Sequence, residues 1–300
     1  MTWLFLTIVS YFFAALVATI DKFLVSKKIP QPISYTFYIG ILSIFSLLLI
    51  FIGGLVFPTT TQFFISFLTG ALFILALLFF FQSLKINEPS RVIPLVGSFI
   101  PVFSFVLSFF ILDEKFSGLT LIALCFLILG GFLIAIVKYK GKEWFIQGWF
   151  FVILASLFFA FSFVLSKVIY LQLPFISGFI WIRFGSFIFS LGFLLIGKWR
   201  KIIFDSLKTT EKKVSLLFLS NQGFSAFAFI LLNLAISLVS VPLINALQGL
   251  QYIFIFFFAL IISKKFSYLF QEELEKKVIL QKIIAIILIL IGLFILSFAR

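Results

Sequence analysis

The sequence predicts an all-α integral membrane protein with ten transmembrane helices, arranged as two inverted five-helix repeats. Three observations lead to this fold class: apolar runs of spanning length, a one-sided distribution of lysine and arginine, and an internal repeat. Hydrophobic residues make up 63% of the 300-residue chain and charged residues only 11%, which is too little charge to solvate a soluble surface. The runs are continuous rather than alternating, so helices are expected rather than barrel strands.

The apolar runs are about 20 residues long, the length a helix needs to cross a hydrocarbon core about 30 Å thick. Charged residues, Pro, Gly or Ser interrupt the sequence between them. No basic stretch precedes the first run at Trp3, so no cleavable signal peptide is expected. The expected spans are roughly 3–25, 33–55, 63–84, 90–112, 118–137, 147–169, 175–197, 214–236, 241–263 and 279–298.

Lysine and arginine lie almost entirely in the loops on one side of the predicted spans. Of the 23 such residues, only Lys115, Lys167, Arg183 and Arg300 fall elsewhere. Cytoplasmic loops carry this excess of positive charge, so we expect these loops in the cytoplasm and both termini outside, in a multi-pass protein of the plasma (inner) membrane. The net charge of +13 then indicates contact with lipid headgroups rather than with nucleic acid.

Short motifs recur in the same order in the two halves of the chain. Ser10–Ala14 (SYFFA) is similar to Ser156–Ala160 (SLFFA). Further along, Asp113–Ser117 (DEKFS) aligns with Ser263–Ser267 (SKKFS). The alternative is that any two Phe-rich helices look alike, but several matches in one order favour a repeat.

The repeat divides the chain into residues 1–140 and 141–300, each with five expected spans. Because five is odd, the second half would enter the membrane from the opposite side. Inverted repeats of this kind are typical of alternating-access carriers, whose site lies near the midplane between the halves.

Several short motifs together resemble one known group of membrane proteins. They are Ser90–Pro94, Pro101-Val102, Leu112–Phe116 and Leu129–Leu133 in the first half, and Leu157–Ala160, Phe163–Lys167, Ala246–Tyr252 and Ile291-Gly292 in the second. With these residues the chain resembles the drug/metabolite transporter superfamily and, within it, the EamA-like transporter family. The resemblance covers essentially the whole chain and implies a ten-helix carrier that moves small organic solutes, often outward.

The chain departs from the pattern of this family in two ways. Gln251 stands where the first half has Pro101. Members of the family commonly carry a basic loop between spans 2 and 3 and keep their termini inside, whereas here the loop Gly53–Gln62 has no charge and the basic loop is Lys198–Lys213. The charge pattern therefore indicates a flipped topology and leaves the direction of transport open.

Three charged residues within or near the spans are candidates for function. Arg183 lies about 12 Å into the seventh span, where it should face a cavity or a partner and could bind a carboxylate or phosphate. A structural arginine that caps a neighbouring helix is the alternative. Lys167 lies near the outer end of its span and could instead snorkel to the interface. Asp21 is the coupling candidate, because no other acid falls plausibly within a span, and Lys22 or Lys27 could pair with it.

Polar and aromatic side chains in the spans complete the candidate substrate site. Asn245, Gln248 and Tyr252 are spaced i, i+3 and i+7, on one face of a helix. Helix–helix hydrogen bonding is the alternative to cavity lining for these residues, and an interfacial anchor is the alternative for the tryptophan. The remaining candidates are Gln251, Asn221, Gln222, Ser98, Trp181 and Tyr38.

Histidine is absent from the sequence and Cys125 is the single cysteine. We therefore expect no metal site, no cofactor and no enzymatic activity. The expected partners are a small-molecule substrate and the lipid bilayer, without nucleic acid, for a monomer or homodimer. The expected function is an alternating-access carrier, an exporter of a small polar or anionic organic metabolite such as an amino acid. Efflux of hydrophobic drugs and flipping of a lipid-linked carrier are the alternatives within transport, and a membrane enzyme or a scaffold lies outside it.

Overall fold

The computed structural model describes residues 2–28, 31–87, 89–135, 148–263 and 276–298. All regular structure in these ranges is helical and none of it is a strand, which confirms the predicted all-α class. Several basic residues assigned to the cytoplasmic loops fall at 136–147 and 264–275, outside the described residues.

The helices of the first half follow the predicted apolar runs. They are α1 (Thr2–Phe23) with the π-helical η1 (Leu24–Lys28), α2 (Pro32–Leu42) with the 3₁₀ segment η2 (Ser43–Leu49) and α3 (Ile50–Gly53), α4 (Thr60–Ile86), α5 (Pro89–Ile111) and α6 (Gly118–Ala135). α4 begins at a capping box, in which Thr59 and Gln62 each accept a hydrogen bond from the backbone N–H of the other.

The helices of the second half include one that the sequence interpretation placed in a loop. They are α7 (Trp149–Tyr170), α8 (Phe175–Leu191) with the 3₁₀ segment η3 (Gly192–Leu195), α9 (Gly197–Thr209), α10 (Lys212–Leu238), α11 (Val241–Ala246), α12 (Gly249–Ser263) and α13 (Lys276–Phe298). The unexpected helix is α9, which lies where the basic loop 198–213 was predicted.

Six helices of the described residues are long and apolar enough to cross a membrane. They are Thr2–Asp21, Pro32–Gly53, Thr60–Ile86, Trp149–Tyr170, Phe175–Leu195 and Lys212–Leu238. Shorter apolar helices occupy Leu95–Ile111, Gly118–Leu133, Val241–Ile255 and Ile283–Ile295, within the predicted fourth, fifth, ninth and tenth spans. The chain is therefore a multi-pass membrane protein.

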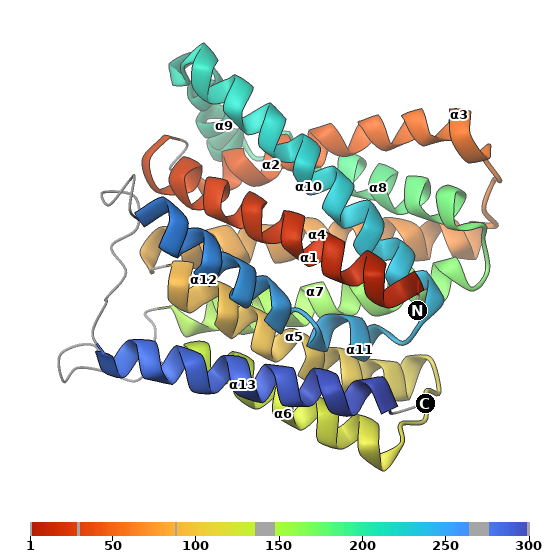
Figure 1. Cartoon of the computed structure of the whole chain (residues 1–300). Coiled ribbons are helices and arrows are strands. Elements are labelled where there is room, and N and C mark those ends of the chain that lie inside the picture. The colour runs from red at the N-terminus through yellow and green to blue at the C-terminus, as the bar shows by residue number, and fades with distance from the viewer. Residues whose placement is uncertain (1, 29–30, 88, 136–147, 264–275, 299–300) are drawn as a thin grey trace.

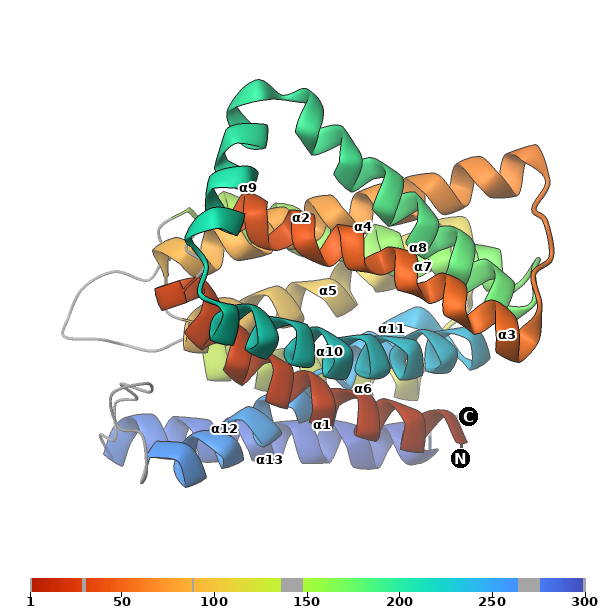
Figure 2. The same ribbon diagram turned by 90° about the horizontal axis from the view of Figure 1, so that it is seen from above.

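The long helices lie side by side along a common direction, as Figures 1 and 2 show. α4 packs along α7, α6 along α13, and α1 along α10. α1 begins and α13 ends at the same end of the bundle (Figure 1). At the opposite end α9 crosses the bundle, and we call this the basic end because α9 and the start of α10 carry lysine and arginine there.

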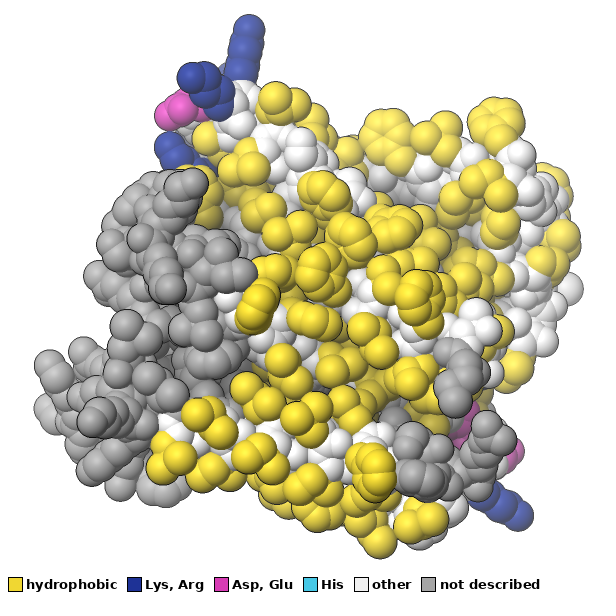
Figure 3. All heavy atoms as spheres, viewed as in Figure 1, with side chains coloured by type: hydrophobic (Ala, Val, Ile, Leu, Met, Phe, Trp, Pro, Cys, Tyr) yellow, Lys and Arg dark blue, Asp and Glu magenta, His cyan; other side chains and the backbone are white. Residues whose placement is uncertain are grey.

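The outer surface of the bundle is apolar, as expected for a surface in contact with lipid. Phe51 is 88% exposed, Phe57 78% and Phe5 67%. Figure 3 shows hydrophobic side chains across the middle of one face, with charged side chains gathered toward its two ends. This banded distribution matches a bundle that spans a bilayer.

α9 is an amphipathic helix that is anchored to α2. Ile203 is fully buried, and its carbonyl accepts a hydrogen bond from the Tyr38 hydroxyl at 2.9 Å. Trp199 packs on Phe193 with ring centroids 5.2 Å apart. The exposed side of α9 carries Phe204 and the basic side chains of Lys198, Arg200, Lys201 and Lys208. Basic and apolar groups on one crosswise helix are typical of a helix that lies in the membrane interface.

Replacing Arg200, Lys201 and Lys208 with glutamine should weaken the stabilisation of the protein by anionic lipid. A cation near an anionic leaflet contributes about 1 kcal/mol. The melting temperature should therefore rise less for the triple variant than for the wild type when phosphatidylcholine nanodiscs are exchanged for phosphatidylglycerol nanodiscs. Lys115→Gln, at the opposite end of the bundle, is the control and should keep the full response. An equal response in the triple variant would contradict the interfacial role of α9.

Candidate functional site

A cavity of about 200 Å³ lies inside the bundle, between helices of both halves of the chain. Its wall is mostly apolar, with phenylalanine rings from α4, α7 and α10. The polar side chains on the wall are Ser10, Tyr11, Asp21, Ser225, Asn245, Gln248 and Gln251. An engineered cavity of about 150 Å³ holds benzene, and drug-sized ligands need about 300 Å³ or more. The cavity therefore suits a small organic solute.

The predicted ninth span, 241–263, consists of two helices rather than one. α11 and α12 are separated by a two-residue turn that ends at Gln248. In this turn the backbone N–H of Gln248 donates to the carbonyl of Asn245 at 3.1 Å. The carbonyl of Ile244, which a continuous helix would use, accepts instead from the Tyr11 hydroxyl of α1 at 2.9 Å. A side chain from the other half of the chain thus satisfies the carbonyl that the break leaves free.

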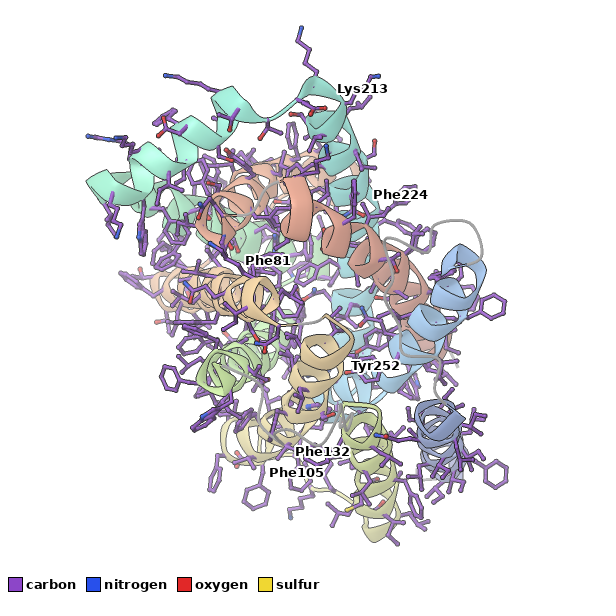
Figure 4. The ribbon with its side chains drawn as sticks, turned by 90° about the vertical axis from the view of Figure 1, so that its left-hand side faces the viewer. Phe81, Phe105, Phe132, Lys213, Phe224 and Tyr252 are labelled. Carbon is purple, nitrogen blue, oxygen red and sulfur yellow. The ribbon has the colours of Figure 1, made fainter. Side chains whose placement is uncertain are left out.

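The break decides which amides reach the cavity. Asn245, Gln248 and Gln251 all line it, whereas Tyr252 is buried against Gly97 of α5; Figure 4 shows Tyr252 on the side of α12 that faces α5. The amide nitrogen of Gln248 lies 3.5 Å from the amide oxygen of Gln251. Asn245 donates to the Ser104 hydroxyl at 2.7 Å, so part of its hydrogen bonding is used within the protein. Gln248 and Gln251 are therefore the amides best placed to meet a ligand.

Asp21 joins three helices at the wall of the cavity. The hydroxyl of Tyr35, on α2, and the amide nitrogen of Asn221, on α10, both donate to its Oδ1, the latter at 2.6 Å. The hydrogen bonds from described residues reach only this oxygen of the carboxyl. Tyr35 is fully buried and packs against the rings of Phe81 and Phe218. This packing fixes the hydroxyl that binds the Asp21 carboxyl. The side chains of Lys22 and Lys27, the expected partners, lie outside the described residues.

Arg183 lies behind the cavity wall rather than on it. Its guanidinium carbon is 4.6 Å from the centre of the Phe73 ring and 4.9 Å from that of Phe229, and both rings line the cavity. Nη2 donates to the Ser43 hydroxyl at 2.6 Å. Nη1 is buried and has no hydrogen-bond partner among the described residues. The arginine is therefore solvated mainly by aromatic faces.

Comparison with known proteins identifies the first part of the chain. Residues 1–136 match the family model of the EamA-like transporter family. This part of the chain is therefore similar to EamA-like transporters. The match confirms the family resemblance over these residues. It is also consistent with the resemblance to the drug/metabolite transporter superfamily that the sequence motifs indicated.

The fold as a whole is also found in a solved structure. A crystal structure described only as that of a protein superposes with a TM-score of 0.62 at 14% sequence identity, and the alignment covers 96% of this chain and 97% of that chain. At this identity the likeness shows the fold alone. No curated protein matches the sequence.

The other predicted site residues do not line the cavity. Lys167 donates to the Ser237 carbonyl at 2.9 Å, and Trp181 donates to the Val56 carbonyl at 3.0 Å. Tyr38 of α2 donates to the Ile203 carbonyl of α9. Ser98 lies near Gly131, between α5 and α6. Asn221 contacts Asp21, and its neighbour Gln222 is buried with no partner for Nε2 among the described residues. Trp181 packs with Phe57 and Phe63, which fits an interfacial anchor.

Two tyrosines that support the candidate site were missed by the sequence interpretation. Tyr11 satisfies the free carbonyl of the broken ninth span, and Tyr35 holds Asp21. Both lie in apolar runs, and a tyrosine buried in a membrane helix needs a partner for its hydroxyl. This requirement was the signal that could have found them. In the part of the chain described, no three His, Cys, Asp or Glu side chains lie close enough to hold a metal ion.

α7 and α10 contact each other at the end of the bundle opposite the basic end. The Tyr170 hydroxyl donates to Asn233 at 2.9 Å, and Lys167 binds the carbonyl of Ser237 in the last turn of α10. A lysine at the end of a helix interacts favourably with the unpaired carbonyls there. Glu114, in the loop between α5 and α6, interacts electrostatically with the same lysine.

Glu114 should make stability depend on pH. Burial raises the pKa of its carboxyl above the ordinary value of 4.5, and the charge of Lys167 partly opposes this. Between pH 4.5 and the raised pKa, the folded protein binds more protons than the unfolded chain. The free energy of unfolding therefore falls as the pH rises through this range. Glu114→Gln should flatten the profile of melting temperature against pH, whereas Lys167→Met should extend the fall to higher pH. Parallel profiles for the wild type and Glu114→Gln would contradict this prediction.

Proposed function

We propose that the chain is an alternating-access carrier of ten spans, with residues 1–140 and 141–300 as inverted five-helix repeats. The packing of the helices supports this symmetry. α1 packs along α10, and α4 packs along α7. These four helices are the predicted first, eighth, third and sixth spans, in that order. Exchanging the two halves exchanges the first span with the sixth and the third with the eighth, so the pair α1 and α10 becomes the pair α7 and α4. The contacts of α1 with α12 and of α7 with α5 are related in the same way.

The observation that carries the proposal is the cavity at the break between α11 and α12. Helices of both halves line it, and its wall combines phenylalanine rings with Asp21, Gln248 and Gln251. Carriers built from inverted repeats commonly bind their solutes where a discontinuous helix lines a cavity between the repeats. Such a site binds and releases a solute without covalent change, so the activity is transport rather than catalysis.

The solute is a small organic molecule with an apolar body and polar groups that include an amine, as an amino acid has. Among the described residues that line the cavity, Asp21 alone is charged, so it favours a positive group. Gln248 and Gln251 can bond to polar substituents, and the rings can cover the apolar part. The protein acts in the bilayer as a monomer or homodimer and binds no nucleic acid.

Export from the cytoplasm is the direction that the arrangement supports. The cavity reaches Asp21 and Leu84, which lie near the basic end of α1 and α4. The excess of lysine and arginine supports a cytoplasmic position for this end, at the plasma membrane, with both termini outside. Because α7 and α10 contact each other at the far end, the solute would load from the cytoplasm.

Efflux of hydrophobic amines is the second candidate. The phenylalanine rings around a single carboxylate favour it, since aromatic faces and a negative charge both attract organic cations. A larger and less selective set of ligands would distinguish this function from transport of a defined metabolite.

Binding to the purified protein tests the proposal. L-Phenylalanine and phenethylamine should each raise the melting temperature of the wild type in a concentration-dependent way. The double variant Gln248→Leu, Gln251→Leu should bind L-phenylalanine at least tenfold more weakly. Gln172→Leu, in the exposed loop after α7, is the matched control and should bind like the wild type. Unchanged binding by the double variant would place the site elsewhere.

A further inference from the structure

Arg183 is a buried cation whose hydrogen bonding is incomplete. Its side chain is 8% exposed, and its one hydrogen bond to a described residue joins Nη2 to the Ser43 hydroxyl. Nη1 has no partner among the described residues, and the one ion pair within 4 Å that they contain joins Lys28 and Glu211. A buried guanidinium normally has an acidic partner or a full set of acceptors, because an unpaired buried charge is strongly unfavourable.

Two phenylalanine rings lie between this guanidinium and the cavity. Phe73 of α4 and Phe229 of α10 cover it on one side and line the cavity on the other, with ring centroids 4.8 Å apart. Movement of these two rings away from each other would uncover the guanidinium on the side of the cavity. The rings belong to different halves of the chain, so a rocking motion of the halves would also separate them.

The chemistry of the missing partner follows from the guanidinium. Its planar fork matches the two oxygens of a carboxylate, and charge-assisted bonds of this kind are about twice as strong as neutral ones. We propose that Arg183 is a binding site for the carboxylate of the transported solute, reached from the cavity when Phe73 and Phe229 rotate away. This inference rests on the proposed transport function and names a second chemical group of its solute.

Arg183 and Asp21 are too far apart to hold one amino acid at both ends. α1 and α8 begin at the same end of the bundle (Figure 1), and Asp21 lies 19 residues into α1 whereas Arg183 lies 8 residues into α8. At 1.5 Å per residue the two differ by about 16 Å along the bundle. The ammonium and the carboxylate of an α-amino acid are separated by one carbon, so the solute meets Asp21 near the basic end and Arg183 deeper in the protein.

A purely structural arginine would give a different result from a carboxylate site. As a structural group it would join η2 to α8 through Ser43, and its loss would lower stability without changing which solutes bind. A carboxylate site instead predicts selectivity that depends on the charge and shape of the guanidinium. The two roles are therefore separated by a ligand series rather than by stability alone.

The experiment compares four probes on protein in nanodiscs: L-phenylalanine, L-phenylalaninamide, 3-phenylpropionate and phenethylamine. The wild type should bind L-phenylalanine at least tenfold more tightly than the amide, and this preference should vanish in Arg183→Gln while the affinity for phenethylamine stays the same. Arg183→Lys keeps the charge but loses the fork, so it should fold and retain a reduced preference. Arg200→Gln, on the exposed side of α9, is the matched control.

The outcomes separate this inference from the proposed function. A preference for the carboxylate that persists in Arg183→Gln, or that is absent from the wild type while phenethylamine binds, overturns the inference alone. If no probe binds, the proposed solute class fails, and labelling by phenylglyoxal decides the accessibility of Arg183. Faster modification of Arg183 in Phe229→Ala than in the wild type, measured by peptide mass spectrometry, supports the path from the cavity. No modification in either protein overturns it.

Discussion

Replacing Gly70 with valine should prevent α4 from packing against α8. A Cβ atom at Gly70 would lie 2.3 Å from the backbone nitrogen of Ser186 and 2.4 Å from the carbonyl oxygen of Ile182. Both contacts are with backbone atoms, so no side-chain rotation can relieve them and the two helices must move apart. The contact is reciprocal, because a Cβ at Gly185 would lie 2.7 Å from the Cα of Phe67. Association of membrane helices depends on such close packing between small residues.

We expect Gly70→Val to remove most of the monodisperse protein from a size-exclusion profile, and Gly70→Ala to lower the melting temperature. Overpacking typically costs about 1–3 kcal/mol, and valine adds two methyl groups to the alanine clash. Gly223→Ala is the matched control in α10, where an added Cβ would meet nothing within 4 Å. It should be neutral or slightly stabilising, because alanine favours a helix by about 1 kcal/mol over glycine. Equal melting temperatures for Gly70→Ala and Gly223→Ala would show that the helices do not approach this closely.

The existence of the helices could be predicted from the sequence because apolar length alone decides it. A span needs about 20 apolar residues whichever way its side chains point, and the runs from Thr60 to Ile86 and from Trp149 to Tyr170 supply them. α9 was missed because its charges suggested a loop. Trp199, Ile202, Ile203 and Ser206 are spaced i, i+3, i+4 and i+7 along its packed side, and this pattern was the available signal.

The site was harder to predict because the rotation of an apolar helix leaves little trace in its sequence. A helix that is hydrophobic all round has no polar face to mark its buried side. The depth of Arg183 was therefore readable, but its position behind Phe73 rather than on the cavity wall was not. The break before Gly249 also depends on Tyr11, which lies 233 residues from the carbonyl that it satisfies. Contacts of that range are decided by packing and not by local sequence.

The second large effect is expected for Asp21→Asn, which should strongly weaken the binding of phenethylamine while preserving the fold. Asparagine keeps the shape of the side chain and an oxygen that can accept from Tyr35 and Asn221. It removes the negative charge that the amine of a solute would meet at the cavity wall. Loss of one member of a buried charge pair commonly costs about 2–5 kcal/mol, so the affinity for phenethylamine should fall by roughly 30-fold or more.

Competition binding and uptake into proteoliposomes would measure this effect, with Asp205→Asn on the exposed side of α9 as the matched control. The melting temperature of the unliganded variant should stay close to that of the wild type. Because Asp21 and Arg183 lie about 16 Å apart along the bundle, one L-phenylalanine molecule meets them in separate poses, so the double variant Asp21→Asn, Arg183→Gln should lose more affinity than the two single losses added together. Undiminished binding of phenethylamine by Asp21→Asn would mean that the carboxyl only holds α1, α2 and α10 together. Single losses that simply add in the double variant would mean instead that the two charges meet the solute in one pose, and that the separation inferred along the helices is too large.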